Sequence, residues 1–479
     1  MATEEPQTDT KCVPATHGRD LTVGSIPRHL IAFSIPMLMG SGLHTLYSIV
    51  NAIWVGKGLG QTEFAAVTVS FPVFFFLMAV AGGLTMAANV LAAQSCGAKD
   101  FDQLKRVVRN SVVLTITVSL ACVIFGHFSA TAILRLMDTS PEVLPMAARY
   151  LQIFLLSMPF MFGMFLMASL LRGTGDSKTP LYFQGAGVIV TAILDPLLMF
   201  GWLGFPRMGL NGTAVATVIG NSGALIAVLI YLQRKRHLVT PDWRHLGIDW
   251  DTSWLTLKIG VPSMAQQALV SIGMVVMVKL INAYGDNGTA AFGAAIRIDQ
   301  IAFMPAMTIG MAVSTLAGQN IGAERFHRVS ETLKWGMISG GGITLLISAI
   351  VIAFPTQLLG LFLNNPKAIS IGVSYLHIVG AAYVMFAVMF VSNGVINGAG
   401  HTLVTTFITL LALWGVRVPL AYYLSTTTHH IEGIWWGMVS GFSLGALMSL
   451  AYYLSGRWKK PIVRKTPVPI DPEIVPVAE

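Results

Sequence analysis

Twelve long runs of apolar residues constrain this chain more than any other feature of its sequence. A helix needs about 20 mostly apolar residues to cross a bilayer. The runs lack the period-two alternation of barrel strands and are too long for them. We therefore predict an all-α integral membrane protein with twelve transmembrane helices. The predicted spans are 30–54, 64–92, 107–134, 143–170, 179–201, 211–232, 255–284, 288–317, 334–358, 369–397, 403–424 and 433–455.

The charged residues are few and unevenly distributed. Only 11% of the residues are charged, whereas a soluble domain carries about 25%. Of the 30 lysines and arginines, 22 fall on one side of the predicted membrane, 4 on the other and 4 within spans. The positive-inside rule then puts both termini in the cytoplasm of a multi-pass protein in the cell (inner) membrane. The loop pattern explains the net charge of +8 without a nucleic-acid partner.

Three sequence landmarks recur at one offset of 225 residues. The pairs are Gly60 and Gly285, Gln94 and Gln319, and Gly173 and Gly398. We place the two glutamine segments, QSCGAKDF and QNIGAERF, in loops after the second and eighth spans. Each half holds six spans, so both halves enter the membrane from the same side. The sequence therefore predicts two parallel six-helix lobes related by an axis along the membrane normal.

This repeat divides the chain into five parts. Residues 1–27 form a cytoplasmic N-terminal tail, and residues 28–233 form the N-lobe with spans 1–6. Residues 234–254 form a cytoplasmic linker between the lobes. Residues 255–456 form the C-lobe with spans 7–12, and residues 457–479 form a cytoplasmic C-terminal tail.

Several stretches resemble the MATE family, the multidrug and toxic compound extrusion transporters, in its prokaryotic form. They are NAIWVGKGLG (51–60), LRGTGDSKTP (171–180), LDPLLMFG (194–201), VRVPLAYYL (416–424) and the two glutamine segments. The resemblance covers about residues 28–455. It implies a secondary-active antiporter that exports amphipathic, mostly cationic compounds in exchange for H⁺ or Na⁺, by alternating access of two lobes. The expected partners are these small molecules and the lipid bilayer, with no cofactor beyond the coupling ion and a monomeric state.

Asp195 is the first candidate for ion coupling. A carboxylate at membrane depth costs about 2.5–3.5 kcal/mol on insertion scales and marks a functional site by default. Where many relatives resemble DTIFVG, this chain reads NAIWVG, so Asn51 replaces an aspartate, and an amide carries no proton. Thr191 stands where relatives resemble NIVLDP, and we add Thr213 to the site. The alternatives are a capping or pairing role for Asp195 and an interhelical hydrogen bond for Asn51.

The branch within the family follows from the C-lobe. The norfloxacin-exporter (NorM-like) branch has acidic residues in spans 7 and 10. Val270 and Phe386 occupy our matching positions, and neither side chain can bind a cation. The resemblance is therefore closer to the DinF-like branch, whose coupling site lies in the N-lobe.

Polar residues within the spans are candidates for a substrate cavity. For Asp299 and Arg417 we favour a structural ion pair across the C-lobe, with a substrate or coupling role as the alternative. Pro36 and Pro262 occupy similar places in spans 1 and 7 and can serve as hinges. The cavity candidates are Tyr47, Gln184, Gln266, Gln267, Arg297, Asp299, Asn393 and Arg417.

Two other classes of function were weighed against transport by antiport. A flippase for lipid-linked saccharides shares the two-lobe plan, but its cavity would be expected to hold several basic residues for pyrophosphate, and only four lie within spans. A membrane-embedded enzyme would need a nucleophile–base set or a metal-spaced cluster of His, Asp or Glu. The sequence shows neither, so we predict no catalytic residues and no metal site.

Overall fold

The computed structural model describes residues 18–137, 139–243, 247–460 and 462–463. Most of the predicted tails, residues 1–17 and 464–479, and part of the linker, 244–246, lie outside the described residues. The first half contains α1 (Ile26–Ile53), η1 (Trp54–Leu59), α2 (Gln61–Gly97), α3 (Phe101–Leu136), α4 (Leu144–Leu155), α5 (Met158–Gly173), α6 (Lys178–Phe200), η2 (Trp202–Gly204) and α7 (Leu210–Lys235). The second contains α8 (Trp250–Asn282), α9 (Gly285–Gly322), α10 (Phe326–Ala353), α11 (Pro355–Gly360), α12 (Pro366–Ala381), α13 (Tyr383–Gly398), α14 (Thr402–Thr409), η3 (Leu410–Arg417), α15 (Val418–Thr428) and α16 (Glu432–Leu454).

The predicted helical spans are confirmed, but two of them are broken. Ten helices of the described chain are long and apolar enough to cross a membrane, and two bent pairs raise the number to 12. The pairs are α4 with α5, bent by 45°, and α12 with α13, bent by 44°. Pro159 at the start of α5 lacks an N–H, which weakens the helix at the first break. The second break contains no proline. The predictions of unbroken spans over 143–170 and 369–397 are wrong in this respect.

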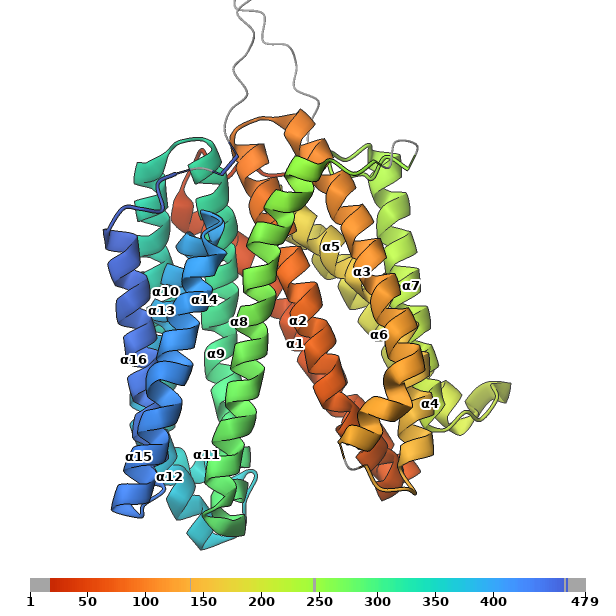
Figure 1. Ribbon diagram of the computed structural model, residues 1–479, viewed down its shortest axis with the longest axis vertical. Helices are drawn as coiled ribbons and strands as arrows, with labels where there is room; N and C mark the ends of the chain where they lie inside the picture. The colour runs from red at the N-terminus through yellow and green to blue at the C-terminus, as the bar shows by residue number, and fades with distance from the viewer. Residues whose placement is uncertain (1–17, 138, 244–246, 461, 464–479) are drawn as a thin grey trace, which may run out of the picture.

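The helices form two lobes, α1–α7 and α8–α16, that meet at one end (Figure 1). From this joined end the lobes spread apart toward the other end. Gly83 of α2 allows close approach at the junction, because a Cβ there would lie 2.5 Å from the carbonyl oxygen of Gly260 in α8. Each lobe also has its own apolar core, with Leu170 buried in the first and Trp435 in the second.

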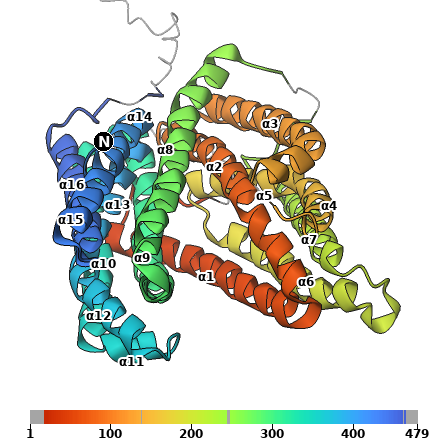
Figure 2. The ribbon, with the colours of Figure 1, turned by 60° about the horizontal axis from the view of Figure 1, so that its bottom comes forward.

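Helix α1 belongs to both lobes. In Figure 2 it crosses from the helices of the C-lobe to α6 of the N-lobe. Leu30 and Phe33 in its first half are buried in a cluster with Ile309 of α9, whereas Gly40 in its second half faces Leu181 of α6. Pro36 lies inside the helix between these two contacts. The segment that joins the lobes therefore contains the residue best suited to bend it.

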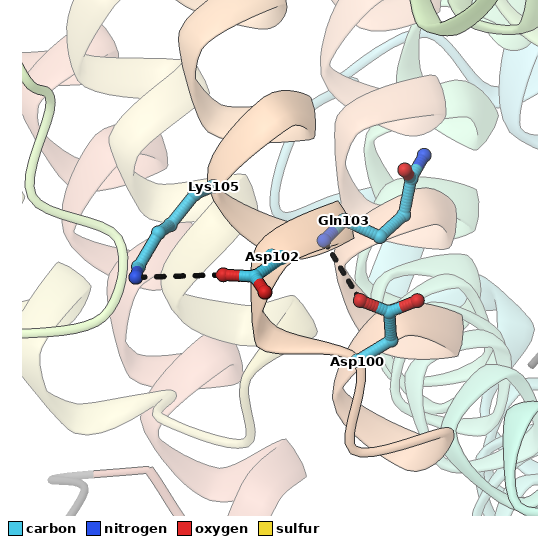
Figure 3. Close-up of polar contacts among 4 residues, drawn as sticks. All are labelled: Asp100, Asp102, Gln103 and Lys105. Carbon is cyan, nitrogen blue, oxygen red and sulfur yellow. Dashed lines mark hydrogen bonds and ion pairs between the residues drawn. The ribbon is translucent and has the colours of Figure 1, made fainter. Parts of the chain in front are cut away.

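The prediction that Gln94 and Gln319 lie in loops is wrong. Helix α2 continues to Gly97 and α9 to Gly322, so both glutamines lie in the last turns of long helices. Their polar side chains are buried and hydrogen-bonded, which permits helix where a loop was expected. The turn after α2 ends at Asp100, whose carboxylate accepts a hydrogen bond from the Gln103 backbone N–H and caps α3 (Figure 3).

Candidate functional site

Asp195 lies on α6 with only 1% of its surface exposed. Two donors from α1 hold one of its oxygens. The Asn51 side-chain amide donates to Oδ2 at 2.7 Å, and the Tyr47 hydroxyl donates to the same atom at 3.0 Å. The other oxygen, Oδ1, is buried and accepts no hydrogen bond from the described residues. The carboxylate is thus fixed on one side and unpartnered on the other.

Local sequence explains how α1 and α6 meet at this carboxylate. Tyr47 and Asn51 are four residues apart and so share one face of α1. Thr191 lies one turn before Asp195, where α6 packs tightly on α7. A Cβ at Gly220 of α7 would lie 1.9 Å from the Thr191 hydroxyl, so only glycine fits there. This close packing of α7 on α6 contributes to the burial of Asp195.

The structure brings two of the predicted residues, Tyr47 and Asn51, into contact with Asp195. Tyr47, predicted for the substrate cavity, contacts Asp195 directly. Thr191 and Thr213 are both buried, but their hydroxyls donate to carbonyl groups of their own helices, those of Gly187 and Leu210. Their assignment to ion coupling stays a prediction.

Sequence reasoning missed Tyr150 of α4. This side chain is buried in the N-lobe core and lies within electrostatic range of Asp195. An isolated tyrosine in an apolar run has no pattern that separates it from ordinary packing residues. Only the folded arrangement of α4 beside α7 identifies it.

A second buried carboxylate, Asp299 of α9, is fully satisfied. Tyr375 of α12 and Tyr383 of α13 each donate a hydroxyl hydrogen bond to one of its oxygens. The predicted ion pair with Arg417 is wrong. Arg417 is near enough to interact electrostatically with Asp299, but the two side chains form no salt bridge. The salt bridge found among the described residues joins Lys105 and Asp102. Two tyrosines take the positions that the arginine was expected to occupy.

Arg417 instead lies over the Phe442 ring at 5.0 Å from its centroid. Its Nε–H is buried and donates to no acceptor among the described residues. Arg297 is exposed and lies over Phe362 at 5.7 Å from the ring centroid. Both arginines therefore rest on aromatic faces.

The remaining cavity candidates are dispersed. Gln266 donates to the Thr409 hydroxyl at 2.8 Å, Gln267 is exposed, and Asn393 is buried and accepts from the Ser449 hydroxyl at 2.7 Å. Gln184 is half-buried on α6. Two surface hollows at the far end of the C-lobe contain none of the candidates. The structure thus does not bring the cavity residues into one site, and that assignment stays a prediction.

The hinge candidates lie inside helices, Pro36 in α1 and Pro262 in α8. Across the described residues, no three side chains of His, Cys, Asp or Glu form a group able to hold a metal ion. Within the part of the chain that the structure describes, Asp195 Oδ1 is the one buried carboxylate oxygen without a hydrogen-bond partner.

Known proteins match both halves of the chain. The MatE family model matches residues 36–197 and 262–423, once in each lobe. The chain is 34% identical to the probable multidrug resistance protein YoeA of Bacillus subtilis, over 92% of this chain and 96% of that one. It is 23% identical to the multidrug export protein MepA of Staphylococcus aureus, over 89% and 94% of the two chains.

Solved structures give the same result for the fold. A MATE crystallised with MaD3S superimposes with a TM-score of 0.86 at 24% identity, covering 92% of this chain and 98% of that one. A transporter of the MOP superfamily from Pyrococcus furiosus gives 0.85 at 24% identity, over 93% and 99%. The repeated family match and the high identity to YoeA over nearly the whole chain show that this protein belongs to the MatE family of membrane transporters.

Proposed function

We propose that this transporter is a multidrug efflux antiporter in the cell membrane, with both termini in the cytoplasm. It exports amphipathic, mainly cationic organic compounds in exchange for H⁺ or Na⁺. The names of YoeA and MepA support drug export. The basic residues concentrated at one side of the predicted membrane support the orientation.

One observation carries the coupling role. Asp195 is a buried carboxylate with two donors on Oδ2 and none on Oδ1. Charge buried in a membrane is costly unless it is compensated, and a bound cation at Oδ1 would supply the missing compensation. A proton needs only this one oxygen. Sodium needs several oxygens, and Asn51 supplies no second carboxylate, so the site favours a proton.

Helix α1 offers a route from this site to the movement of the lobes. Tyr47 and Asn51 bind Asp195 from the second half of α1, while Leu30 and Phe33 pack in a cluster with C-lobe residues from its first half. Binding and release of the ion at Asp195 changes the strength of its hydrogen bonds to Tyr47 and Asn51 of α1. The helix then bends at Pro36. Binding of the ion and binding of the drug then compete through the position of the lobes.

The test is drug-driven proton and sodium flux in proteoliposomes, comparing wild type with Asp195→Asn. Asp102→Asn, an exposed carboxylate on α3, is the matched control. We expect transport to require an imposed gradient and to be lost in Asp195→Asn alone. If both variants transport like wild type, coupling does not occur at Asp195. If no amphipathic cation moves under any gradient, drug export is wrong and transfer of lipid-linked saccharides becomes the leading hypothesis.

A further inference from the structure

The joined end of the two lobes carries a reciprocal pair of glutamine hydrogen bonds. Gln94 of the N-lobe donates its side-chain amide to the carbonyl of Gly398 in the C-lobe at 2.9 Å. Gln319 of the C-lobe donates to the carbonyl of Gly173 in the N-lobe at 2.8 Å. These four residues form two of the pairs related by 225 positions. Each lobe therefore donates one glutamine hydrogen bond to a glycine carbonyl of the other lobe and accepts the equivalent bond in return.

The backbones around these bonds are in direct contact. A Cβ at Gly97 would lie 1.9 Å from the carbonyl oxygen of Gln319, and a Cβ at Gly322 would lie 2.1 Å from that of Gln94. Both glutamines are at most 1% exposed. Buried polar groups that lose their partners cost about 1–3 kcal/mol each. Separation of the lobes must therefore break both cross-lobe hydrogen bonds. Each glutamine side chain then either stays buried without its partner or becomes exposed to water.

The terminal segments of the chain complete this contact. The Gln319 side-chain oxygen accepts from the Leu21 backbone N–H at 3.0 Å. The Gln94 oxygen accepts from the backbone N–H groups of Ile462 and Val463 at 3.1 and 3.2 Å. All the hydrogen-bonding atoms of each glutamine amide thus contact either the other lobe or a terminal segment.

Each terminal segment packs into the lobe at the other end of the chain. Leu21 is buried in the cluster that contains Leu316 and Trp458 of the C-terminal half. Val463 is buried in the cluster that contains Leu104 and Leu170 of the N-lobe. The exchange is reciprocal, like the glutamine bonds, and the two segments cross the lobe boundary in opposite directions.

Basic side chains fix the N-terminal segment on the C-lobe. Arg325 donates to the Thr22 carbonyl at 2.8 Å, and Arg328 donates to the Gly24 carbonyl at 2.9 Å. Arg325 lies in the turn after α9, and Arg328 lies in the first turn of α10. These hydrogen bonds therefore fix the N-terminal segment to the C-lobe.

We propose that these residues form the closed gate of the transporter at the joined end of the two lobes. Gln94 and Gln319 are its latch, and residues 18–24 and 462–463 are straps that the closed gate requires. The inference deepens the proposed transport function and rests on it, since a gate matters only if the lobes alternate. On this proposal, residues 18–24 and 462–463 lower the population of molecules in which the gate is open.

The test measures the distance across the gate in protein reconstituted without drug or gradient. The background replaces Cys12, Cys96 and Cys122 with serine. Spin labels are placed at Asp102→Cys and His327→Cys, exposed positions in the first turns of α3 and α10, one in each lobe (Figure 3 shows Asp102). Wild type should give one narrow distance distribution, because the latch is closed.

The informative variant is Gln94→Glu with Gln319→Glu. It keeps the oxygens that accept from the straps and removes both donors that cross between lobes. Loss of two hydrogen bonds should favour the open gate by roughly 30-fold, seen as a second, longer distance. Gln152→Glu is the control, since its amide donates within the N-lobe, to the His127 carbonyl at 3.1 Å. If the double variant does not fold, each single variant should show a smaller shift in the same direction.

Truncation after Lys460 tests the straps separately. It removes the donors to Gln94 but leaves both cross-lobe bonds, so a smaller long-distance population is expected. Distances unchanged from wild type in the glutamate variants would overturn the latch, and unchanged distances in the truncated chain would overturn the straps. Flux measured in the same vesicles separates the two proposals. If the glutamate variants shift the distances but the wild type transports no drug, the gate is supported and the efflux function is wrong.

Discussion

Asn51 and Asp195, 144 positions apart in the chain, are joined by a 2.7 Å hydrogen bond from the asparagine amide to the carboxylate. The asparagine replaces an acidic residue that the family resemblance led us to expect. It has kept the position of that residue but reversed its role, because an amide donates to a carboxylate where a second acid would repel it. The site therefore holds one carboxylate instead of two.

Replacing Asn51 with leucine should reduce drug-driven flux about tenfold or more. The change leaves Tyr47 as the one donor to Asp195 Oδ2, and a hydrogen bond to a charged group contributes about 1.5–3 kcal/mol. Flux in proteoliposomes measures the effect, with Gln152→Leu as control. Wild-type flux in Asn51→Leu would show that the amide does not support coupling.

Replacing Asn51 with aspartate should change how the exchange depends on pH, while the site still binds one ion. Two carboxylates at this separation share one cation instead of each binding its own. The expected result is flux with altered dependence on external pH, and the measurement is a pH series on wild type and variant side by side. Superimposable pH profiles would contradict this expectation.

The tyrosines around Asp299 should matter for stability more than for coupling. Tyr375→Phe and Tyr383→Phe each remove one donor from a buried carboxylate. The cost should be about 1.5–3 kcal/mol each, seen as a lower melting temperature in detergent. Tyr182→Phe, at an exposed position, should melt like wild type. A loss of gradient dependence without a loss of stability would instead place Asp299 in the coupling reaction.

Two adjacent glycines of α2 provide a matched comparison. Alanine in place of glycine stabilises a helix by roughly 0.5–1 kcal/mol, and this gain is common to both positions. A Cβ at Gly83 would lie 2.3 Å from Met264 Cγ in the other lobe, whereas a Cβ at Gly82 has no heavy atom within 4 Å. Gly83→Ala should therefore melt below Gly82→Ala. Equal melting temperatures would mean that the lobes do not press together here.

Pro36→Ala should slow transport without unfolding the protein. The substitution restores a helical N–H and stiffens α1 between its contacts with the two lobes. Flux should fall while the melting temperature stays the same or rises. Unchanged transport would end the proposal that α1 bends at this residue.

The twelve spans and the two lobes could be predicted from the sequence because apolar length and the 225-residue offset are properties of the chain alone. Asp195 could be predicted because a carboxylate in an apolar run is costly wherever it lies. Its partner Tyr47 and the tyrosines around Asp299 could not, because tyrosine hydroxyls in apolar runs give no sign of where they point. The polar letters around Gln94 and Gln319 predicted loops, since their burial depends on a lobe that is distant in sequence.

The exchanged terminal segments impose an order on folding. Val463 enters the core of the lobe that is made first, although it is synthesised after every helix of the second lobe. A lobe can pack its own helices during synthesis, but the contact of the first lobe with Val463 has to wait until the helices of the second lobe have been made. Every newly made molecule therefore begins with the Gln94 side of this junction incomplete, and the junction is finished last.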